Sequence, residues 1–360
     1  MDVEIKLLDE LVGACGVPGE EGDVRAVIAR HLSDITEISY DGLGSIICRR
    51  QGGEKTPVIT LSGHMDEVGF IVRSISDEGF LRFSALGGWW DHILPGQRVL
   101  VKSQHGYIPG VIGVKPPHLL TEDDRKKVME RKDMYIDVGA TTRNQVESEF
   151  GVRIGDAVVP DSPLRVMKNP DRVMAKAWDD RIGCAIFVEV LKRLQGLKHP
   201  NTVYGIGTVQ EEVGARGART SAFATDPGVA FALDVTTAAD TPEFTGDQRN
   251  ALVGKGPCIV VMDGSLVPNR PLRLFVEGVA RELRIPFQNT LLERGGTDAG
   301  MIHVNRTGVP SLFVAVPARY IHAPVGMVSL SDYRATVDLL TEVITRLDAA
   351  TVRSFTAWEG

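Results

Sequence analysis

Apolar residues recur at two different spacings along the chain, and the change of spacing divides it into regions. Near the N-terminus, apolar positions three or four residues apart predict helices at about residues 3–13 and 21–32, with a Gly/Pro turn between them. Short β-branched runs then predict strands at 38–40, 45–48 and 58–62. The run at 58–62 is apolar throughout, which is typical of a strand covered on both faces.

The region from residue 68 to 165 has the pattern of a separate β-rich domain. Short β-like runs alternate there with Gly, Pro and Asp turns, and the charged stretch 122–131 is its one candidate for a helix. After residue 176, strands and helices alternate again. We expect helices at 181–194, 216–224, 272–283 and 331–347, and strands at 203–209, 229–235, 287–292 and 311–316.

This alternation predicts the α/β fold class, with a mixed, mostly parallel sheet flanked by helices. The expected organisation is a discontinuous α/β domain of residues 1–67 and 166–360. An inserted, β-barrel-like domain of residues 68–165 interrupts it.

Composition and charge narrow the classes of function. The 360 residues are 43% hydrophobic and carry a net charge of -7. This acidic balance disfavours nucleic-acid binding, which usually needs a basic stripe. The first residues are acidic and amphipathic, and no run approaches 18 apolar residues, so we expect neither a secretory leader nor a membrane span. The four cysteines are scattered, as expected for reduced thiols in the cytoplasm.

Five short segments concentrate side chains that bind metals: GHMDEVG, AWDDRIG, VQEEVG, ALDV and RYIHAP. Three of them directly follow apolar runs, at the carboxyl ends of predicted strands, where ligands gather in open α/β sheets. Acids placed there lose solvation, so a compensating cation is expected. Imidazoles and carboxylates without thiolates suit Zn²⁺, Co²⁺ or Mn²⁺. The residues are His64, Asp66, Asp179, Asp180, Glu211, Glu212, Asp234 and His322.

Each segment also has a plain alternative. The HxD pair is often an ordinary hydrogen-bonded pair, Asp180 suits a helix cap, and adjacent glutamates often form a solvated helix face. The joint occurrence of all five segments, in the order H-x-D, D, E-E, D, H, favours a site. Neighbouring residues of a strand point in opposite directions, so at a strand end one glutamate can bind metal while the other serves as a general base.

These five segments, in this order along the chain, resemble those of the tetrahedral aminopeptidase family of co-catalytic zinc metallopeptidases, also called glutamyl aminopeptidases. The stretches GVIGVKPPHLL, IDVGA, GTDAG and RYIHAPVGM are similar to it as well, and the match runs from about Gly16 to the C-terminus. The family carries its extra domain in the gap that here separates Asp66 from Asp179, whereas carboxypeptidase and deacylase relatives carry theirs after the glutamate pair. The resemblance implies a cytoplasmic aminopeptidase that acts on short peptides with a free N-terminus.

The resemblance also implies two divalent ions per subunit, with Zn²⁺ expected first and Co²⁺ or Mn²⁺ as alternatives. His64 and Asp234 would bind one ion, Glu212 and His322 the other, and Asp179 would bridge them.

The remaining roles follow from the same resemblance. Glu211 would be the general base on a water that bridges the metals, and Asp66 would orient His64. The substrate would approach Gly296, Thr297 and Asp298, although these residues equally suit a simple helix start. Trp178 and Gly326 depart from the family pattern and leave the pocket shape open.

The resemblance further implies self-association through the inserted domain, with a dodecamer expected. Two other functions remain open at this point. One is an N-acyl amino acid deacylase that uses the same metals, and the other is a non-catalytic oligomeric scaffold. An endoglucanase label, which some relatives carry, conflicts with a metal-dependent site, because glycosidases use paired carboxylates without metals.

Overall fold

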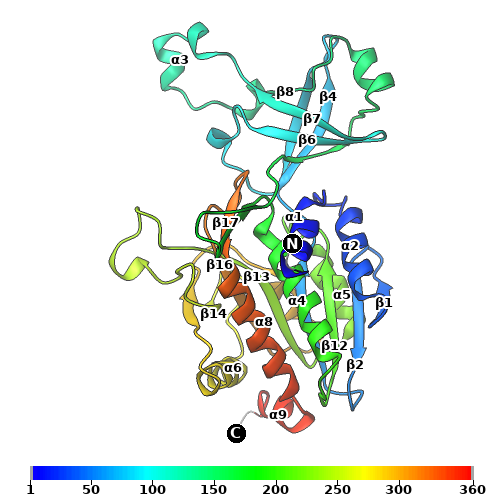
Figure 1. Cartoon of the computed structure of the whole chain (residues 1–360), viewed down its shortest axis with the longest axis vertical. Coiled ribbons are helices and arrows are strands. Elements are labelled where there is room, and N and C mark those ends of the chain that lie inside the picture. The colour runs from blue at the N-terminus through cyan, green and yellow to red at the C-terminus, as the bar shows by residue number, and fades with distance from the viewer. Residues whose placement is uncertain (1–2, 358–360) are drawn as a thin grey trace.

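The computed structural model describes residues 3–357 and shows two bodies, an α/β domain and a β-barrel beyond one end of it (Figure 1). The outermost residues of the expected α/β domain, 1–2 and 358–360, lie outside the described part of the chain. Within residues 3–357, no helix combines the length and the apolar content that crossing a membrane requires.

The α/β domain is built on an eight-stranded sheet. Its strands are β1 (Glu37–Tyr40), β2 (Ile46–Gln51), β3 (Val58–His64), β12 (Thr202–Thr208), β13 (Val229–Thr237), β14 (Cys258–Met262), β15 (Gln288–Leu291) and β16 (Ser311–Ala318). They lie in the order β1-β2-β12-β3-β13-β16-β14-β15. The four central strands, β12, β3, β13 and β16, run parallel, whereas β2 and β14 join them in antiparallel fashion. The predicted mixed, mostly parallel sheet is confirmed.

Helices cover both faces of this sheet. They are α1 (Val3–Gly13), α2 (Gly22–Leu32), α4 (Trp178–Leu194), α5 (Arg216–Thr225), α6 (Arg270–Glu282), α7 (Asp298–Ile302), α8 (Leu330–Thr345) and α9 (Ala349–Ser354). Because strand side chains alternate, Phe231 and Leu233 of β13 pack into the large core with α1, α2, α4 and α8, and Ala230 packs with α5 and α7. Strands buried on both faces are therefore apolar throughout, as the sequence indicated.

The inserted segment forms a closed barrel with the strand order β4-β5-β8-β7-β6-β9. These strands are β4 (Gly69–Ile75), β5 (Leu81–Leu86), β6 (Arg98–Ser103), β7 (Gly106–Gly113), β8 (Tyr135–Asp137) and β9 (Ala157–Pro160), and the short helix α3 (Glu122–Lys126) lies on an arm beside them. The barrel has its own core, which includes Phe70, Phe83 and Ile136. All six strands fall inside residues 68–165, and the boundaries proposed there remain a prediction.

A small three-stranded sheet follows the barrel on the return to the α/β domain. It consists of β10 (Arg165–Val166), β11 (Arg172–Ala175) and β17 (Gly326–Ser329). Through β17 it positions the loop that leaves β16, and that loop carries His322.

Candidate metal centre and active site

The residues singled out in the sequence come together at one edge of the central sheet. β3 ends at His64, β12 ends just before the two glutamates, and β13 carries Asp234. Because these strands are adjacent and parallel, their carboxyl ends open at the same edge. Two more side chains reach this edge from the start of α4 and from the loop between β16 and β17. We call the five residues the acid–histidine cluster: His64, Asp179, Glu212, Asp234 and His322.

Asp179 lies between two groups of this cluster. Its Oδ1 is 2.9 Å from Nε2 of His64, and that nitrogen is 3.8 Å from Oδ2 of Asp234. Its Oδ2 is 3.3 Å from Nε2 of His322, which is 3.4 Å from Oε2 of Glu212. A tetrahedral Zn²⁺ with bonds of about 2.0–2.2 Å holds its ligand atoms about 3.3 Å apart. These spacings have the size that two cations sharing one carboxylate would need.

The carboxylates of the cluster repel one another. Burial and the charge of Asp179 raise the pKa of Glu212 to about 8. Burial and the charges of Asp180 and Asp179 raise the pKa of Asp234 well above its usual range. Oε1 of Glu212 is buried without a hydrogen-bond partner, and within residues 3–357 these acids pair with histidines and with no Lys or Arg. This donor set fits a divalent metal ion, which would supply the missing positive charge.

Close contact between His64, His322 and Asp179 shifts the pKa values within the cluster. Burial alone would lower the pKa of His64, but its hydrogen bond to Asp179 and the charge of Asp234 hold that pKa well above the usual range. Burial alone would raise the pKa of Asp179, yet the hydrogen bonds from His322 and His64 hold it below the usual range. Asp179 is therefore the carboxylate whose charge both histidines favour.

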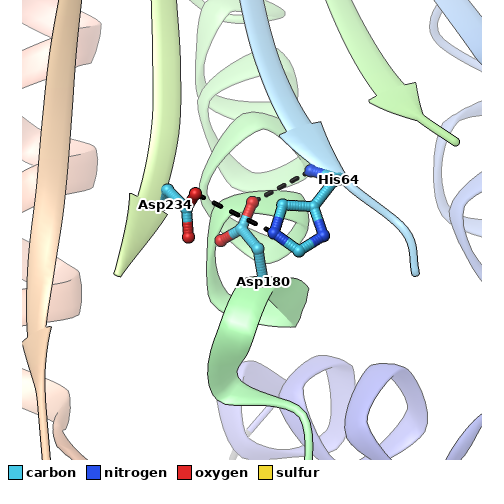
Figure 2. Close-up of side chains that lie close together, drawn as sticks. All are labelled: His64, Asp180 and Asp234. Carbon is cyan, nitrogen blue, oxygen red and sulfur yellow. Dashed lines mark hydrogen bonds and ion pairs between the residues drawn. The ribbon is translucent and has the colours of Figure 1, made fainter. Parts of the chain in front are cut away.

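Asp180 lies beside His64 and Asp234 (Figure 2), and backbone amides already bind both of its oxygens. Oδ2 accepts from N of His64 at 3.0 Å, and Oδ1 accepts from N of Gly183 at 2.9 Å. The cap expected for this residue is thus observed, and it also fixes the end of β3 against α4. The side chains of His64, Asp180 and Asp234 are close enough to hold an ion, but these hydrogen bonds favour a supporting role for Asp180.

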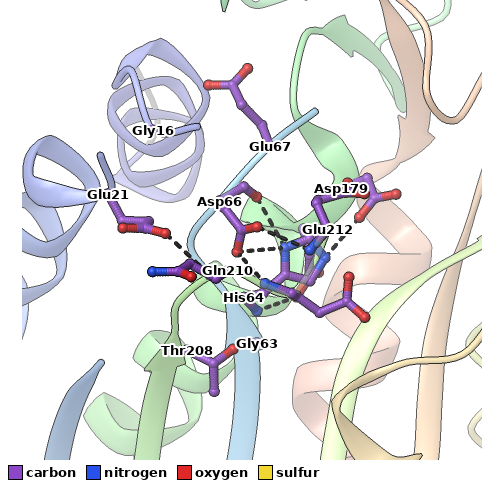
Figure 3. A network of polar contacts seen from close by, with 12 residues as sticks. Gly16, Glu21, Gly63, His64, Asp66, Glu67, Asp179, Thr208, Gln210 and Glu212 are labelled. Atoms are coloured by element: carbon purple, nitrogen blue, oxygen red, sulfur yellow. Dashed lines mark hydrogen bonds and ion pairs between the residues drawn. The ribbon is translucent and has the colours of Figure 1, made fainter. Parts of the chain in front are cut away.

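Two buried carboxylates hold the loop that carries the glutamate pair (Figure 3). Oδ1 and Oδ2 of Asp66 accept from the backbone N–H groups of Glu211 and Glu212 at 2.9 and 3.0 Å. Oε1 of Glu21 accepts from N of Gln210 at 3.1 Å, where the backbone is left-handed with φ 58°. Three consecutive amides are fixed in this way, which sets the path of the loop. Glu21 was not among the predicted site residues, because in the sequence it lies where a Gly/Pro turn meets the start of a predicted helix.

The contact between Asp66 and His64 runs chiefly through the backbone. Nδ1 of His64 is 3.0 Å from the carbonyl oxygen of Asp66 and 3.7 Å from its Oδ1. A histidine that binds metal commonly donates its second ring N–H to such a group, which fixes the ring. The carbonyl of Asp66 is therefore placed to orient His64, while the carboxylate serves the glutamate loop.

A cavity of about 430 Å³ opens beside the acid–histidine cluster. Glu211 lines it, and its carboxylate makes no hydrogen bond or ion pair with any other described residue. Gly296 and Thr297 also line it. Asp298 instead begins α7, and its Oδ2 accepts from Oγ1 of Thr208 at 2.6 Å. The structure thus places two of the three predicted substrate-binding residues in the wall, whereas Asp298 is buried and binds Thr208.

The two departures from the family pattern lie in contact with each other. A Cβ added at Gly326 would lie 3.3 Å from Cδ1 of Trp178. Both residues line a small cavity that also borders Asp179 and His322. The indole of Trp178 thus occupies the space that a side chain at position 326 would need.

A buried ion cluster lies beside the acid–histidine cluster and joins three segments. Oε1 of Glu67 accepts from Nζ of Lys176 at 2.5 Å and from a guanidinium nitrogen of Arg181 at 3.0 Å. The same guanidinium donates to the carbonyls of Leu11, Ala14 and Gly16 at the end of α1. Relative exposures are 1% for Glu67, 4% for Lys176 and 0% for Arg181. One carboxylate therefore holds two buried cations next to the connection into the barrel.

Replacing Glu67 by alanine should destabilise the protein severely. Removing one partner of a buried ion pair leaves an uncompensated charge, which costs about 3–5 kcal/mol. Urea unfolding would measure the loss. Glu37→Ala is a matched control, because Glu37 also pairs with an arginine but is exposed, and its loss should stay within about 1 kcal/mol. Equal losses in the two variants would contradict this assignment.

The fold and the cluster together define a class. Acids and histidines at the carboxyl ends of a parallel sheet, in a chain interrupted by a barrel, are the arrangement of α/β metallopeptidases with an inserted domain. The profile of the M42 glutamyl aminopeptidase family matches residues 44–339. The chain belongs to this family and is therefore a peptide hydrolase.

Individual relatives agree over almost the whole chain. The glutamyl aminopeptidase of Lactococcus lactis is 33% identical over 97% of each chain. The crystal structure of a TET aminopeptidase from a marine sediment archaeon of the Thaumarchaeota is 46% identical, covers 99% of each chain and superposes with a TM-score of 0.95. The TET1 peptidase of Pyrococcus horikoshii, which can assemble into a tetrahedron or a large octahedral shell, is 33% identical. It covers 96% of this chain and 100% of its own, with a TM-score of 0.85. The expected family is confirmed.

Proposed function

We propose that this protein is a dinuclear metal-dependent aminopeptidase that removes the N-terminal residue of short peptides. The observation that carries the proposal is the position of Asp179, whose two oxygens face two separate histidines. His64 and Asp234 would bind one ion, His322 and Glu212 the other, and Asp179 would bridge them. Zn²⁺ is the first candidate, with Co²⁺ or Mn²⁺ as alternatives.

The chain's own groups account for the proton transfers. When bound, the two ions would polarise the scissile carbonyl and lower the pKa of the attacking water. Glu211, free in the cavity wall, would accept the proton of that water and deliver it to the leaving amine. Asp66 and Glu21 would keep its loop in place.

The acidic cavity favours a substrate with a free N-terminus. Glu211, Glu212 and Asp234 all line it, so a protonated α-amine would meet negative charge on approach. An N-acylated substrate lacks that amine, and this difference supports the aminopeptidase over the deacylase. A non-catalytic scaffold would have no use for an unpaired carboxylate at this position.

Self-association through the barrel belongs to the same proposal. The relative from Pyrococcus horikoshii can assemble into a tetrahedron or a large octahedral shell. A dodecamer of this chain would enclose its active sites and admit only short peptides. We propose a cytoplasmic location for such a particle, consistent with four buried, unpaired cysteines among the described residues.

Metal removal and a paired substrate panel would test the proposed function. Aminoacyl-p-nitroanilides should be hydrolysed, and their N-acetylated counterparts should not. A chelator should remove the activity, and Zn²⁺, Co²⁺ or Mn²⁺ added in turn should restore it. Turnover of N-acetylated substrates alone would establish the deacylase instead. Tight metal binding without turnover of either series would establish the scaffold.

A further inference from the structure

His322 is the least supported residue of the acid–histidine cluster. Its side chain is 41% exposed, against 2% for His64 and 5% for Glu212. It lies in the irregular loop between β16 and β17, with a left-handed backbone of φ 54°. Among the described residues, the α/β domain reaches its ring at Nε2, through Asp179 and Glu212, so the Nδ1 side of the ring needs support from elsewhere.

That support comes from the barrel, through the loop between β5 and the short 3-10 helix η1 (Asp91–Ile93). The backbone of Gly88 lies beside the Nδ1 edge of the His322 ring. A Cβ added at Gly88 would lie 3.1 Å from Nδ1 of His322. Nε2, on the other side of the ring, faces Asp179 and Glu212.

Gly87, the glycine before Gly88, lies close to Glu212, which would bind the same ion as His322. A Cβ added at Gly87 would lie 3.2 Å from Oε2 of Glu212 and 2.6 Å from Cγ1 of Val68. Gly87 also has φ +80°, so its backbone alone requires glycine. Gly88 does not have a positive φ. The need for a small residue at Gly88 therefore comes from His322 and not from the turn.

The glycine loop is fixed to the barrel by the next residue. The ring of Trp89 stacks on Phe70 with centroids 4.8 Å apart, and its Nε1 donates to the carbonyl of Gly69 at 3.1 Å. Phe70 belongs to the barrel core and Gly69 begins β4. The position of the barrel thus sets the position of the Gly88 backbone beside His322.

We propose that the inserted barrel completes the metal centre: the bare backbone of Gly87 and Gly88 packs against Glu212 and the His322 ring and keeps both side chains in their binding positions. His64 is held by the carbonyl of Asp66 in its own domain, whereas the position of His322 depends on the barrel. This inference rests on the proposed function, in which both histidines bind metal. Gly88 is a positioning residue, because it acts through His322.

Metal binding by Gly88→Ala would test this inference on the full-length protein. Competition between the protein and a chromophoric chelator, with Co²⁺ as the probe, would give the number and affinity of the bound ions. We expect two ions in the wild type, with the affinity of one weakened roughly 10–100-fold in Gly88→Ala, the range for disturbing the position of a metal ligand, because the added Cβ would press on Nδ1 of His322. The thermal midpoint of the metal-free variant should equal that of Gly42→Ala, a control whose added Cβ meets nothing within 4 Å.

A double-mutant cycle separates positioning from a general structural effect. In the His322→Ala background, Gly88→Ala should cause no further loss of affinity for the remaining ion. A further loss there, or normal binding of both ions by Gly88→Ala, would overturn the inference. A wild type that binds fewer than two ions would instead overturn the proposed function.

A second variant covers the case in which Gly88→Ala does not fold. Trp89→Phe removes the bond to Gly69 but keeps an aromatic ring on Phe70. It should weaken the same ion by a smaller factor, and unchanged binding by a folded Trp89→Phe would count against the inference.

Discussion

Glu211→Gln should remove almost all peptide hydrolysis and leave both metal ions bound. The carboxylate of Glu211 lines the cavity and pairs with no other described residue, so the fold does not depend on its charge. Glutamine keeps the shape but cannot accept a proton. Loss of a general base lowers kcat by about 10²–10⁴-fold. Steady-state kinetics on an aminoacyl-p-nitroanilide, together with metal analysis of the same sample, would measure both effects.

The neighbouring glutamate provides the contrast. Oε2 of Glu212 is 3.4 Å from Nε2 of His322, so Glu212→Gln should lose one ion, which Glu211→Gln should keep. Glu243→Gln, at an exposed position, should change neither property. If Glu211→Gln loses metal while Glu212→Gln keeps it, the two roles have been assigned the wrong way round.

The parallel core could be predicted because each of its elements carries its own pattern. The run from Val58 was expected as a strand covered on both faces, and β3 (Val58–His64) is buried almost throughout. The closing helix was expected at 331–347, and α8 spans Leu330–Thr345. Such patterns reflect burial against the sheet, which repeats along the element and is therefore visible locally.

Prediction failed where one distant contact decides the path of the chain. The charged stretch 122–131 was expected to be helical, but α3 ends at Lys126. The backbone N and Nε of Arg131 both donate to the carboxylate of Asp91. These hydrogen bonds outweigh the helix propensity of a short, exposed and charged segment. The strand β14 was also missed, although Cys258–Met262 is apolar, because it is short and follows a Gly/Pro turn.

The same distinction separates the foreseen from the unforeseen parts of the site. The histidines and acids of the cluster are chemically distinctive residues at strand ends, so their types and order could be read from the sequence. The residues that hold the cluster in place could not be predicted in this way. Glu21 binds the amide of Gln210, which is 189 residues away, and the bare backbone of Gly88 lies against the His322 ring. Contacts with the backbone of a distant segment do not require a particular side chain there, so they cannot be predicted from residue types.

Asp179→Asn should weaken both metal ions at once, unlike a change at any other member of the cluster. Asparagine keeps the size of the side chain but loses the charge and one of the two oxygens that face His64 and His322. Removing one partner of a buried charge pair costs about 3–5 kcal/mol, which corresponds to a loss of about 10²–10⁴-fold in affinity. Hydrolysis should fall with the metal content.

The thermal stabilisation produced by added metal would measure that loss without relying on activity. An ion present at 100 times its Kd stabilises the native state by about 2.7 kcal/mol. After a loss of at least 10²-fold in affinity, the same concentration is at or below the new Kd and contributes about 0.4 kcal/mol or less. The rise in melting temperature on adding Zn²⁺ should therefore nearly vanish in Asp179→Asn. It should persist in the control Asp34→Asn, at an exposed position. If Asp179 bridges the two ions, the variant should show no remaining rise in melting temperature with Zn²⁺. An Asp179 that bound only one ion would leave the stabilisation by the other ion intact.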